Sequence, residues 1–203
     1  MSGVAEKIQR CAVELSEGEV LSAKGLLHLG SRAAVDQALS RLHRSGELIR
    51  VARGLYVAPV RSKFGTRAPK PEMVVAGIAA ATGEKVAPSG AASANAFGLT
   101  TQIPIRSVYL TSGRSRKIHL GRQIVELKRA PRWQLSVPAG PAGEAVRALA
   151  WLGPKHAARA AATLKTHLPP AERAAIIASR PQMPSWLAET VSHAFCEEAG
   201  GDV

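Results

Sequence analysis

The sequence predicts an α+β protein, and three observations along its 203 residues support this fold class. Apolar residues recur at helical spacing over residues 4–15 and 31–45, near the N-terminus. Short runs rich in β-branched residues, each turned at a glycine, follow at residues 48–57 and 107–128. Beyond Pro131, helical patterns separated by prolines continue to the end of the chain. These later helices are predicted at residues 141–152, 155–167, 170–179 and 185–198.

Residues 22–46 predict two helices joined by a tight turn. Ser22 is placed to cap a helix over residues 23–29, because its hydroxyl can accept a hydrogen bond from a backbone N–H of the first turn. Gly30 suits the left-handed position at which many helices end, and Ser31 is placed to cap the next helix, which Gly46 ends. The apolar residues of this second helix share one face: Val35, Ala38, Leu39 and Leu42.

Two short strands follow the pair of helices, at residues 48–51 and 55–57, with a turn at residues 52–54. A further strand near residues 17–20 is expected to complete their sheet. Two helices joined by a glycine-containing turn and followed by a basic hairpin are typical of a winged helix-turn-helix, whose second helix enters the major groove of DNA. The sequence therefore predicts a DNA-binding head over residues 1–60. The alternative is a winged helix that is used only for protein contacts.

The polar side chains of this head are the predicted DNA contacts. Arg32, Gln37 and Arg41 are expected to reach base edges, since Arg pairs with guanine and Gln with adenine in the major groove. The arginines at the end of the helix and in the wing are expected to contact phosphates or to bind in the minor groove. For each single residue, a solvated charge is the alternative. The predicted DNA-binding residues are Arg32, Gln37, Ser40, Arg41, Arg44, Arg50 and Arg53.

The net charge of +12 lies mainly in the middle of the chain. Residues 61–132 carry 13 Lys and Arg against 3 Asp and Glu, whereas residues 1–60 have a net charge of +2 and residues 133–203 are neutral. A cationic surface attracts polyanions because it releases their counterions, so nucleic acid is the predicted partner. The sequence contains no basic amphipathic helix that would favour a membrane surface. A charge that serves only solubility is the alternative.

One segment of this basic region, residues 112–122, is predicted to form a hairpin. Its cations are Arg114, Arg116, Lys117 and Arg122. We predict that they form a second phosphate-binding surface or a contact for an acidic partner. An exposed hairpin with solvated charges is the alternative.

The remaining sequence predicts a linker and a second domain. Residues 61–70 are basic and contain a glycine and a proline, which favours a linker. A helix is predicted from residue 71 to about residue 82, because a proline at its start suits the first helical turn. We therefore predict a C-terminal α/β domain over residues 71–203, with a small sheet and a helical end.

The sequence carries no motif for catalysis or metal binding. It has two aspartates, Asp36 and Asp202, and lacks the HExxH, CxxC, Walker and GxSxG patterns. The six histidines show no paired ligand spacing, and Cys11 and Cys196 offer no disulfide framework. We therefore predict no enzyme activity, no metal and no cofactor. No apolar run approaches the roughly 18 residues of a membrane-spanning helix, and an apolar signal core is absent, which predicts a cytoplasmic protein.

Four segments follow one another in a familiar order: RVARGLYVAP at residues 50–59, KPEMVVAGIAAATG at 70–83, PSGAASANAFGLTTQIP at 88–104 and SVYLT at 107–111. This order resembles the AbiEi family, the antitoxins of type IV toxin–antitoxin systems that act in abortive phage infection. The most specific parts of the resemblance are GLYV at residues 54–57, at the end of the wing, and the segment SGAASANAFGLTTQIP, which includes Asn95, Gly98, Leu99, Thr100 and Pro104. PSWL at residues 184–187 is also similar.

The resemblance implies a repressor head that binds inverted-repeat operator DNA upstream of its own operon, which would place two copies on neighbouring half-sites. It also implies a C-terminal domain that counteracts a cognate nucleotidyltransferase-type toxin, by a role that no motif assigns within residues 70–198. One alternative is a ligand-responsive winged-helix transcriptional regulator without an antitoxin role. Another is an enzyme, against which the scarcity of aspartate argues, because two-metal sites rely on carboxylates.

Overall fold

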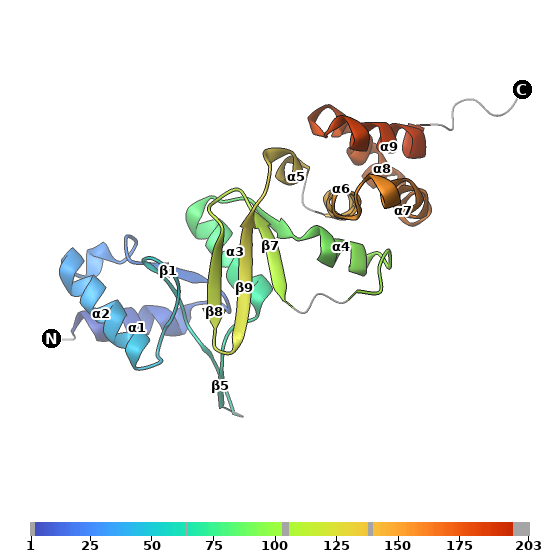
Figure 1. Ribbon diagram of the computed structural model, residues 1–203. Helices are drawn as coiled ribbons and strands as arrows, with labels where there is room; N and C mark the ends of the chain where they lie inside the picture. The colour runs from blue at the N-terminus through green and yellow to red at the C-terminus, as the bar shows by residue number, and fades with distance from the viewer. Residues whose placement is uncertain (1–2, 64, 103–105, 138–139, 197–203) are drawn as a thin grey trace, which may run out of the picture. The chain divides into compact units, whose positions relative to one another are not determined.

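The computed structural model describes residues 3–63, 65–102, 106–137 and 140–196 (Figure 1). The chain divides into two compact units: an N-terminal unit of residues 1–84 and 116–126, and a C-terminal unit of residues 85–115 and 127–203. The N-terminal unit thus takes in a hairpin from much later in the chain. The functional boundaries that we predicted at residues 60 and 70 stay a prediction. Pro104 and Asp202 lie outside the described residues.

The N-terminal unit begins as a winged helix-turn-helix. Its elements are α1 (Val4–Glu14), β1 (Val20–Ser22), the 3₁₀ helix η1 (Leu27–Leu29), α2 (Arg32–Arg44), β2 (Ile49–Ala52) and β3 (Leu55–Val57). The antiparallel sheet has the order β1-β3-β2, with Val57 of β3 opposite both Val20 and Ile49. Ile8, Leu39 and other apolar side chains of the helices fill one core with the sheet, because their helical spacing places them on one face. The predicted α+β fold class is confirmed.

The segment before α2 differs from the helix predicted over residues 23–29. The Ser22 hydroxyl does accept a hydrogen bond from the backbone N–H of Gly25 at 2.9 Å, but turns follow, and then the single 3₁₀ turn of η1. A segment of this length with a glycine in its first turn offers too few hydrogen bonds to offset helix nucleation.

The turn between the two helices also differs in detail. Gly30 has a φ of 169°, which is extended backbone and not the predicted left-handed conformation. A Cβ at Gly30 would lie 2.9 Å from Cγ2 of Val4, so the glycine allows α1 to approach closely. The predicted cap and stop of α2 are confirmed: the Ser31 hydroxyl accepts from the N–H of Ala34 at 3.3 Å, and Gly46 has a φ of +76°.

The predicted linker contains a β-hairpin of β4 (Val60–Ser62) and β5 (Gly65–Arg67). The carboxylate of Glu17 anchors this hairpin, because it accepts hydrogen bonds from Arg67 Nη1 and Nη2 at 2.9 and 3.2 Å and from the backbone N–H of Lys70 at 2.8 Å. These bonds lower the pKa of Glu17 from 4.5 to about 2. The residues between the head and α3 are therefore tied to the end of α1.

Helix α3 (Pro71–Thr82) has the predicted bounds and ends at the left-handed Gly83, with a φ of +71°. It packs on β1 within the N-terminal unit. A Cβ at Gly77 of α3 would overlap the backbone oxygen of Gly18, so the helix and the turn after α1 touch backbone to backbone. No side chain larger than hydrogen fits at this contact.

The last part of the N-terminal unit, residues 116–126, contains β8 (Arg116–Leu120) and the first four residues of β9 (Gln123–Arg129), and the two strands form a hairpin that turns at Gly121 with a φ of +61°. Side chains alternate along both strands, with Ile118, Leu120 and Val125 buried. Strand β8 lies beside β2 of the wing. The two strands therefore lie, to within one residue, in the region where the sequence predicts strand-forming runs, residues 107–128.

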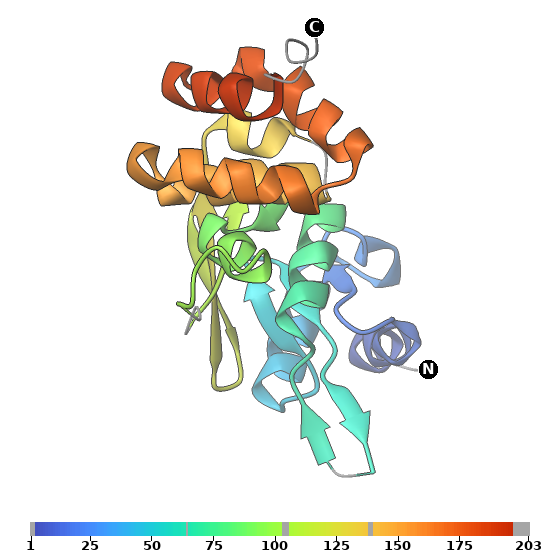
Figure 2. The same ribbon diagram turned by 90° about the vertical axis from the view of Figure 1, so that its right-hand side faces the viewer.

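The C-terminal unit combines short strands with a helical bundle (Figure 2). Its elements are β6 (Val86–Pro88), α4 (Gly90–Ala96), β7 (Ser107–Thr111), α5 (Arg132–Ser136), α6 (Pro141–Leu152), α7 (Pro154–His167), α8 (Pro170–Ala178), the 3₁₀ helix η2 (Arg180–Gln182) and α9 (Ser185–Cys196). Within this unit β6 runs antiparallel to β7, with Ala87 opposite Leu110. Residues 197 and 198 of the last predicted helix lie outside the described residues.

The core of this unit lies among α6, α7, α8 and α9. Leu149, Leu164, Ile176 and Leu187 supply fully buried side chains, one from each helix. Helix α4 packs closely on α6, since a Cβ at Gly90 would overlap the backbone oxygen of Arg147. None of the helices in the described part of the chain combines the length and the apolar character that crossing a bilayer requires.

Candidate nucleic-acid interface

Helix α2 buries one face and presents the opposite one to solvent. Gln37, Arg41 and Arg44 are exposed at spacings of four and three residues, which aligns them along the helix, and Ser40 beside them is half-buried. Together with Asp36, they line a shallow hollow of about 380 Å³. Four of the seven predicted DNA-binding residues therefore lie side by side, on the helix that a winged helix-turn-helix places in the major groove.

Arg32 begins the same helix but already has a partner. Its Nε donates to Oδ2 of Asp36 at 2.8 Å, and both side chains are well exposed. An exposed ion pair of this kind contributes about 0–1 kcal/mol, so Arg32 could exchange the carboxylate for a DNA acceptor at little cost. Its role in base contact stays a prediction.

The end of α2 is fixed to the wing by His43, a residue that the sequence did not single out. Its Nδ1 lies 3.2 Å from the carbonyl oxygen of Leu48, and its ring meets that of Tyr56 edge to face with centroids 6.4 Å apart. Tyr56 is buried on β3. These contacts hold the exposed row of α2 at a fixed angle to the wing, so both can meet one surface of a duplex.

The wing carries the two predicted arginines at its outer side. Arg50 on β2 and Arg53 in the β2–β3 turn are exposed, and neither forms an ion pair with a described residue. The turn is closed by Gly54, with a φ of +72°, whose carbonyl oxygen accepts from the N–H of Ala23 at 2.8 Å. The wing tip is thereby attached to the segment that precedes α2.

The β8–β9 hairpin adds cations next to the wing, because β8 lies beside β2. Lys117 is exposed on β8, and Arg122 is exposed at the turn. Arg116 differs from them: its Nη1 and Nη2 donate to Oε1 and Oε2 of Glu84 at 3.1 and 2.9 Å, and the pair is largely buried. Arg114 belongs to the C-terminal unit, so its place beside the wing stays a prediction.

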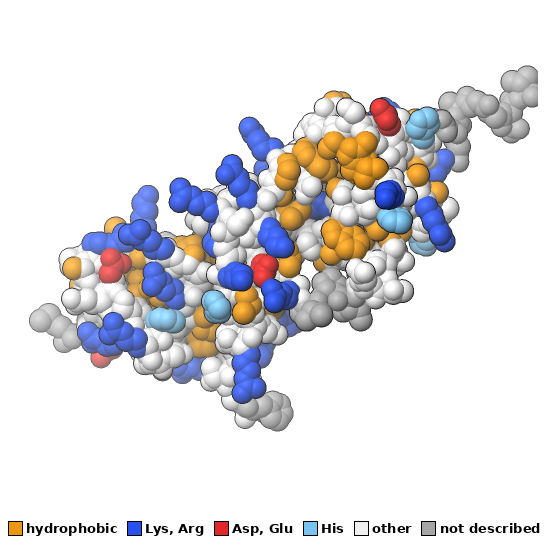
Figure 3. Space-filling model, viewed as in Figure 1, with side chains coloured by type: hydrophobic (Ala, Val, Ile, Leu, Met, Phe, Trp, Pro, Cys, Tyr) orange, Lys and Arg blue, Asp and Glu red, His pale blue; other side chains and the backbone are white. Residues whose placement is uncertain are grey.

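Eight residues of the N-terminal unit make up what we call the recognition surface: Gln37, Ser40, Arg41, Arg44, Arg50, Arg53, Lys117 and Arg122. Figure 3 shows Lys and Arg side chains spread over this part of the molecule. Six of the eight residues are cationic, and Asp36 is the acidic residue that adjoins them on α2. Such an arrangement can neutralise phosphates and offer hydrogen bonds to base edges.

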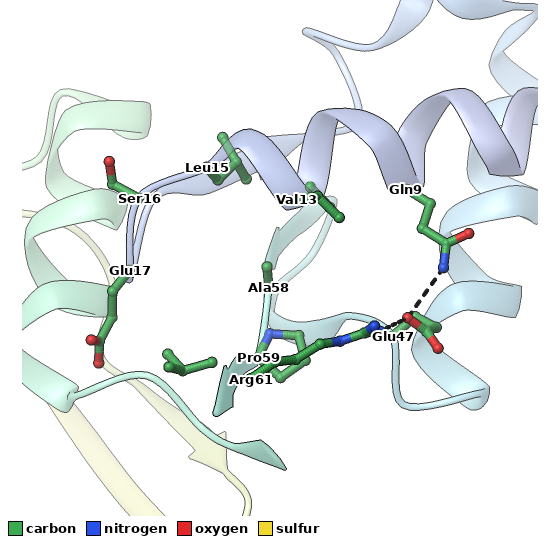
Figure 4. A pocket seen from close by; sticks show the side chains of 11 residues that line it. Gln9, Val13, Leu15, Ser16, Glu17, Glu47, Ala58, Pro59 and Arg61 are labelled. Carbon is green, nitrogen blue, oxygen red and sulfur yellow. Dashed lines mark hydrogen bonds and ion pairs between the residues drawn. The ribbon is translucent and has the colours of Figure 1, made fainter. Parts of the chain in front are cut away.

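A separate pocket of about 300 Å³ lies between α1 and residues 58–61 (Figure 4). Its carboxylate Glu47 accepts a hydrogen bond from Gln9 at 3.3 Å and pairs with Arg61, so the polar groups at this end are already satisfied. Val13 at its rim is 77% exposed. Among the described residues, no group of three or more His, Cys, Asp and Glu side chains could hold a metal ion.

The fold and the recognition surface define a winged-helix protein with a cationic face. The chain belongs to DUF6088, a family of unknown function, whose model matches residues 4–168. The match begins with α1 and ends just after α7, so it covers the recognition surface and the β8–β9 hairpin together. No curated protein and no solved structure matches the chain.

Proposed function

We propose that the protein is a cytoplasmic, non-enzymatic transcriptional repressor that binds operator DNA in front of its own operon. The observation that carries this proposal is the exposed row of Gln37, Arg41 and Arg44 on α2. The wing arginines and the hairpin cations lie in the same compact unit. Sequence-specific DNA binding needs side chains that form paired hydrogen bonds with base edges, and cations beside them that contact the phosphates. The Gln and Arg side chains of α2 and the flanking cations are of these two kinds.

In this proposal each element of the recognition surface has its own task. Helix α2 enters the major groove, where Gln37 and Arg41 pair with base edges. Arg44, Arg50 and Arg53 hold the phosphate backbone and set the register. Lys117 and Arg122 add affinity that does not depend on sequence, because they release counterions from the duplex. Two copies bind the two half-sites of an inverted repeat.

The resemblance to the AbiEi antitoxins supports a second part of the proposal. The protein would counteract a nucleotidyltransferase-type toxin encoded beside it, by direct or indirect action. Helices α6 to α9 share a core within the C-terminal unit, whereas the recognition surface belongs to the N-terminal unit, so one unit could act on a partner while the other holds DNA. Repression and antitoxicity would then be separable by mutation.

The DNA-binding part is tested by fluorescence anisotropy of the full chain on its own upstream DNA and on a scrambled duplex, across a salt series. The expected result is tighter binding to the upstream DNA at near-physiological salt. Equal binding to both duplexes, with the same steep salt dependence, would overturn the repressor proposal and leave only a cationic protein.

The antitoxin part is tested by expressing the neighbouring gene from an unrelated promoter, with and without this protein. Growth arrest that is relieved by the wild type and equally by the Arg41→Ala variant would support antitoxicity independent of repression. A neighbouring gene that is harmless, or an arrest that this protein does not relieve, would overturn it. A DNA affinity that changes with a small ligand, without such rescue, would instead favour the ligand-responsive regulator.

A further inference from the structure

Arg147 of α6 is a buried cation with few partners. Its side chain lies inside the C-terminal unit, with 3% of the residue's surface exposed. Nη1 donates to the carbonyl oxygen of Gln134 at the long distance of 3.4 Å, and buried Nε has no hydrogen-bond partner among the described residues. A guanidinium carries five N–H donors, and the Gln134 carbonyl is the one acceptor that Arg147 contacts among the described residues.

Such a cation is costly to bury, because the charge loses its hydration and gains no anion in exchange. Burial lowers the pKa of Arg147 below 12.5, and the carboxylate of Glu144, one turn earlier on α6, acts in the opposite direction. The two residues do not form an ion pair in the described structure. An arginine nevertheless keeps its proton at neutral pH, so the site holds a positive charge that forms no ion pair with a described residue.

Arg147 lines a pocket of about 310 Å³ within the C-terminal unit. The walls are mainly apolar and come from residues 86–88 of β6 and from Leu135 and Val137, while Lys85 and Ser136 add polar groups. Sites for small ligands have this character: a volume of roughly 300–1,000 Å³, apolar walls and a few convergent polar groups. The pocket therefore has room for a molecule of a few heavy atoms beside Arg147.

Two further groups define where an anion would sit. Gly140 lines the pocket at the start of the 12-residue helix α6, where the carboxylate of Glu172 accepts a hydrogen bond from the backbone N–H of Ala142 at 2.7 Å and already supplies a negative charge. Glu144 also lines the pocket and repels an anion. The anionic group of a ligand is thus directed to the Arg147 side, and the apolar remainder lies against the β6 wall.

We propose that this pocket binds a small molecule through a carboxylate or phosphate group that pairs with the guanidinium of Arg147. Such a group would accept hydrogen bonds from the outer nitrogens of Arg147, which can offer two donors to one oxyanion. The inference does not depend on DNA binding, since every residue it uses lies in the C-terminal unit.

The test uses the full chain and two probes, inorganic phosphate and succinate, each against sodium chloride of equal ionic strength. Thermal unfolding and titration calorimetry are measured for each probe. We expect at least one probe to raise the melting temperature of the wild type and to bind with measurable heat. Response to phosphate alone identifies a phosphoryl ligand, and response to succinate alone identifies a carboxylate. If neither probe changes the melting temperature or gives heat beyond the chloride control, the proposal fails.

Variants separate a binding role from a structural one. Arg147→Met keeps an unbranched apolar stem and removes the guanidinium with its charge, and we expect it to lower the affinity for the active probe by about tenfold or more. The matched control is Arg159→Met, which removes an exposed cation from α7 of the same unit and should leave binding unchanged. Arg147→Lys is a second variant for the case that the Met variant fails to fold; it keeps the charge and loses the bidentate geometry, so weaker binding is again expected.

The stability without ligand gives a further readout. If Arg147 awaits an anion, Arg147→Met should melt at or above the wild-type temperature in chloride, because a buried unpaired charge is replaced by an apolar side chain. If Arg147 only holds α5 through Gln134, the variant should melt at a lower temperature than the wild type. Its response to each probe should then equal that of the wild type. The second pattern would overturn the proposal.

Discussion

Arg116 donates hydrogen bonds from Nη1 and Nη2 to Oε1 and Oε2 of Glu84, at 3.1 and 2.9 Å, and the two residues are 32 positions apart in the sequence. Arg116 is the first residue of β8, and Glu84 follows Gly83, the C-cap of α3. The pair therefore joins two segments of the N-terminal unit that are distant in sequence. Lys117, the next residue, is exposed on the strand. Two neighbouring cations of one predicted basic cluster thus have different surroundings, and they should behave differently when mutated.

Replacing Arg116 by Gln should lower the free energy of unfolding by about 1–3 kcal/mol, because it leaves a largely buried carboxylate without its charged donor. Urea unfolding of the full chain measures this loss. The variant Lys117→Gln/Arg122→Gln should keep the wild-type stability, since both side chains are exposed. It should weaken binding to every duplex alike and reduce the salt slope by about 2, one for each lost phosphate contact. An unchanged salt slope in the double variant would show that the hairpin does not touch DNA.

Replacing Arg41 by Ala should relax sequence preference. If Arg41 makes a bidentate contact with a guanine, the substitution costs about 1–3 kcal/mol on operator DNA and much less on a scrambled duplex. Anisotropy on both duplexes measures the difference. Arg41→Lys is the informative companion, because it keeps the charge but loses the bidentate geometry. A Lys variant that discriminates as well as the wild type would show that Arg41 holds a phosphate and does not read a base. Arg159→Ala, on α7 of the C-terminal unit, serves as the charge control.

Replacing Gly77 by Ala tests the backbone contact between α3 and the turn at Gly18. On helix propensity alone, alanine should stabilise α3 by about 1 kcal/mol. The new Cβ would overlap the oxygen of Gly18 and crowd Val20, so α3 must shift and we expect a net loss of about 1–3 kcal/mol. Urea unfolding decides the sign. Ala76→Gly, at an exposed position of the same helix, is the control and should lose about 1 kcal/mol through propensity. A Gly77→Ala protein more stable than the wild type would contradict the contact.

The sequence predicts the long elements well, because each carries its own local signals. Helices α3 and α6 have the predicted bounds: each opens on a proline, closes on a glycine and has helical periodicity between. Strands β4, β5 and β6 were missed. They are three residues long and are defined by their partners, as β6 is by β7, more than twenty residues away. Such short strands have no alternation long enough to recognise.

The residues of the candidate sites likewise divide into those that a local sequence pattern predicts and those that only the tertiary structure places. The exposed row of α2 follows from periodicity, since burial of Val35, Leu39 and Leu42 leaves Gln37, Arg41 and Arg44 outside. The pairing of Arg116 with Glu84 depends on tertiary structure, so no local pattern could distinguish Arg116 from Lys117. Arg147 was missed although it carried a signal. It is the one cation of a helix whose neighbouring residues are Ala and Val on one side and Ala and Leu on the other, and a charge in such a setting points to a buried site.

The carboxyl of Glu17 should titrate far below its usual range. Hydrogen bonds from Arg67 and from the backbone N–H of Lys70 lower its pKa from 4.5 to about 2, so the folded form favours the carboxylate. An acid whose pKa is depressed by folding stabilises the fold fully above its unfolded pKa and loses this contribution as the pH falls. The anchoring of the β4–β5 hairpin should therefore be intact above about pH 4.5 and lost as the pH falls through about 2.

Carbon-detected NMR of the Glu17 side chain measures this titration directly, and the amide signals of residues 65–70 should follow the same midpoint. Arg67→Gln should raise the midpoint toward 4.5, because it removes the donor that lowers the pKa most. Arg61→Gln is the matched control: it removes an arginine from the partner strand of the same hairpin, one that pairs with Glu47, and should leave the midpoint of Glu17 unchanged. A Glu17 that titrates near 4.5 in the wild type would mean that the hairpin is not held by this carboxylate in solution.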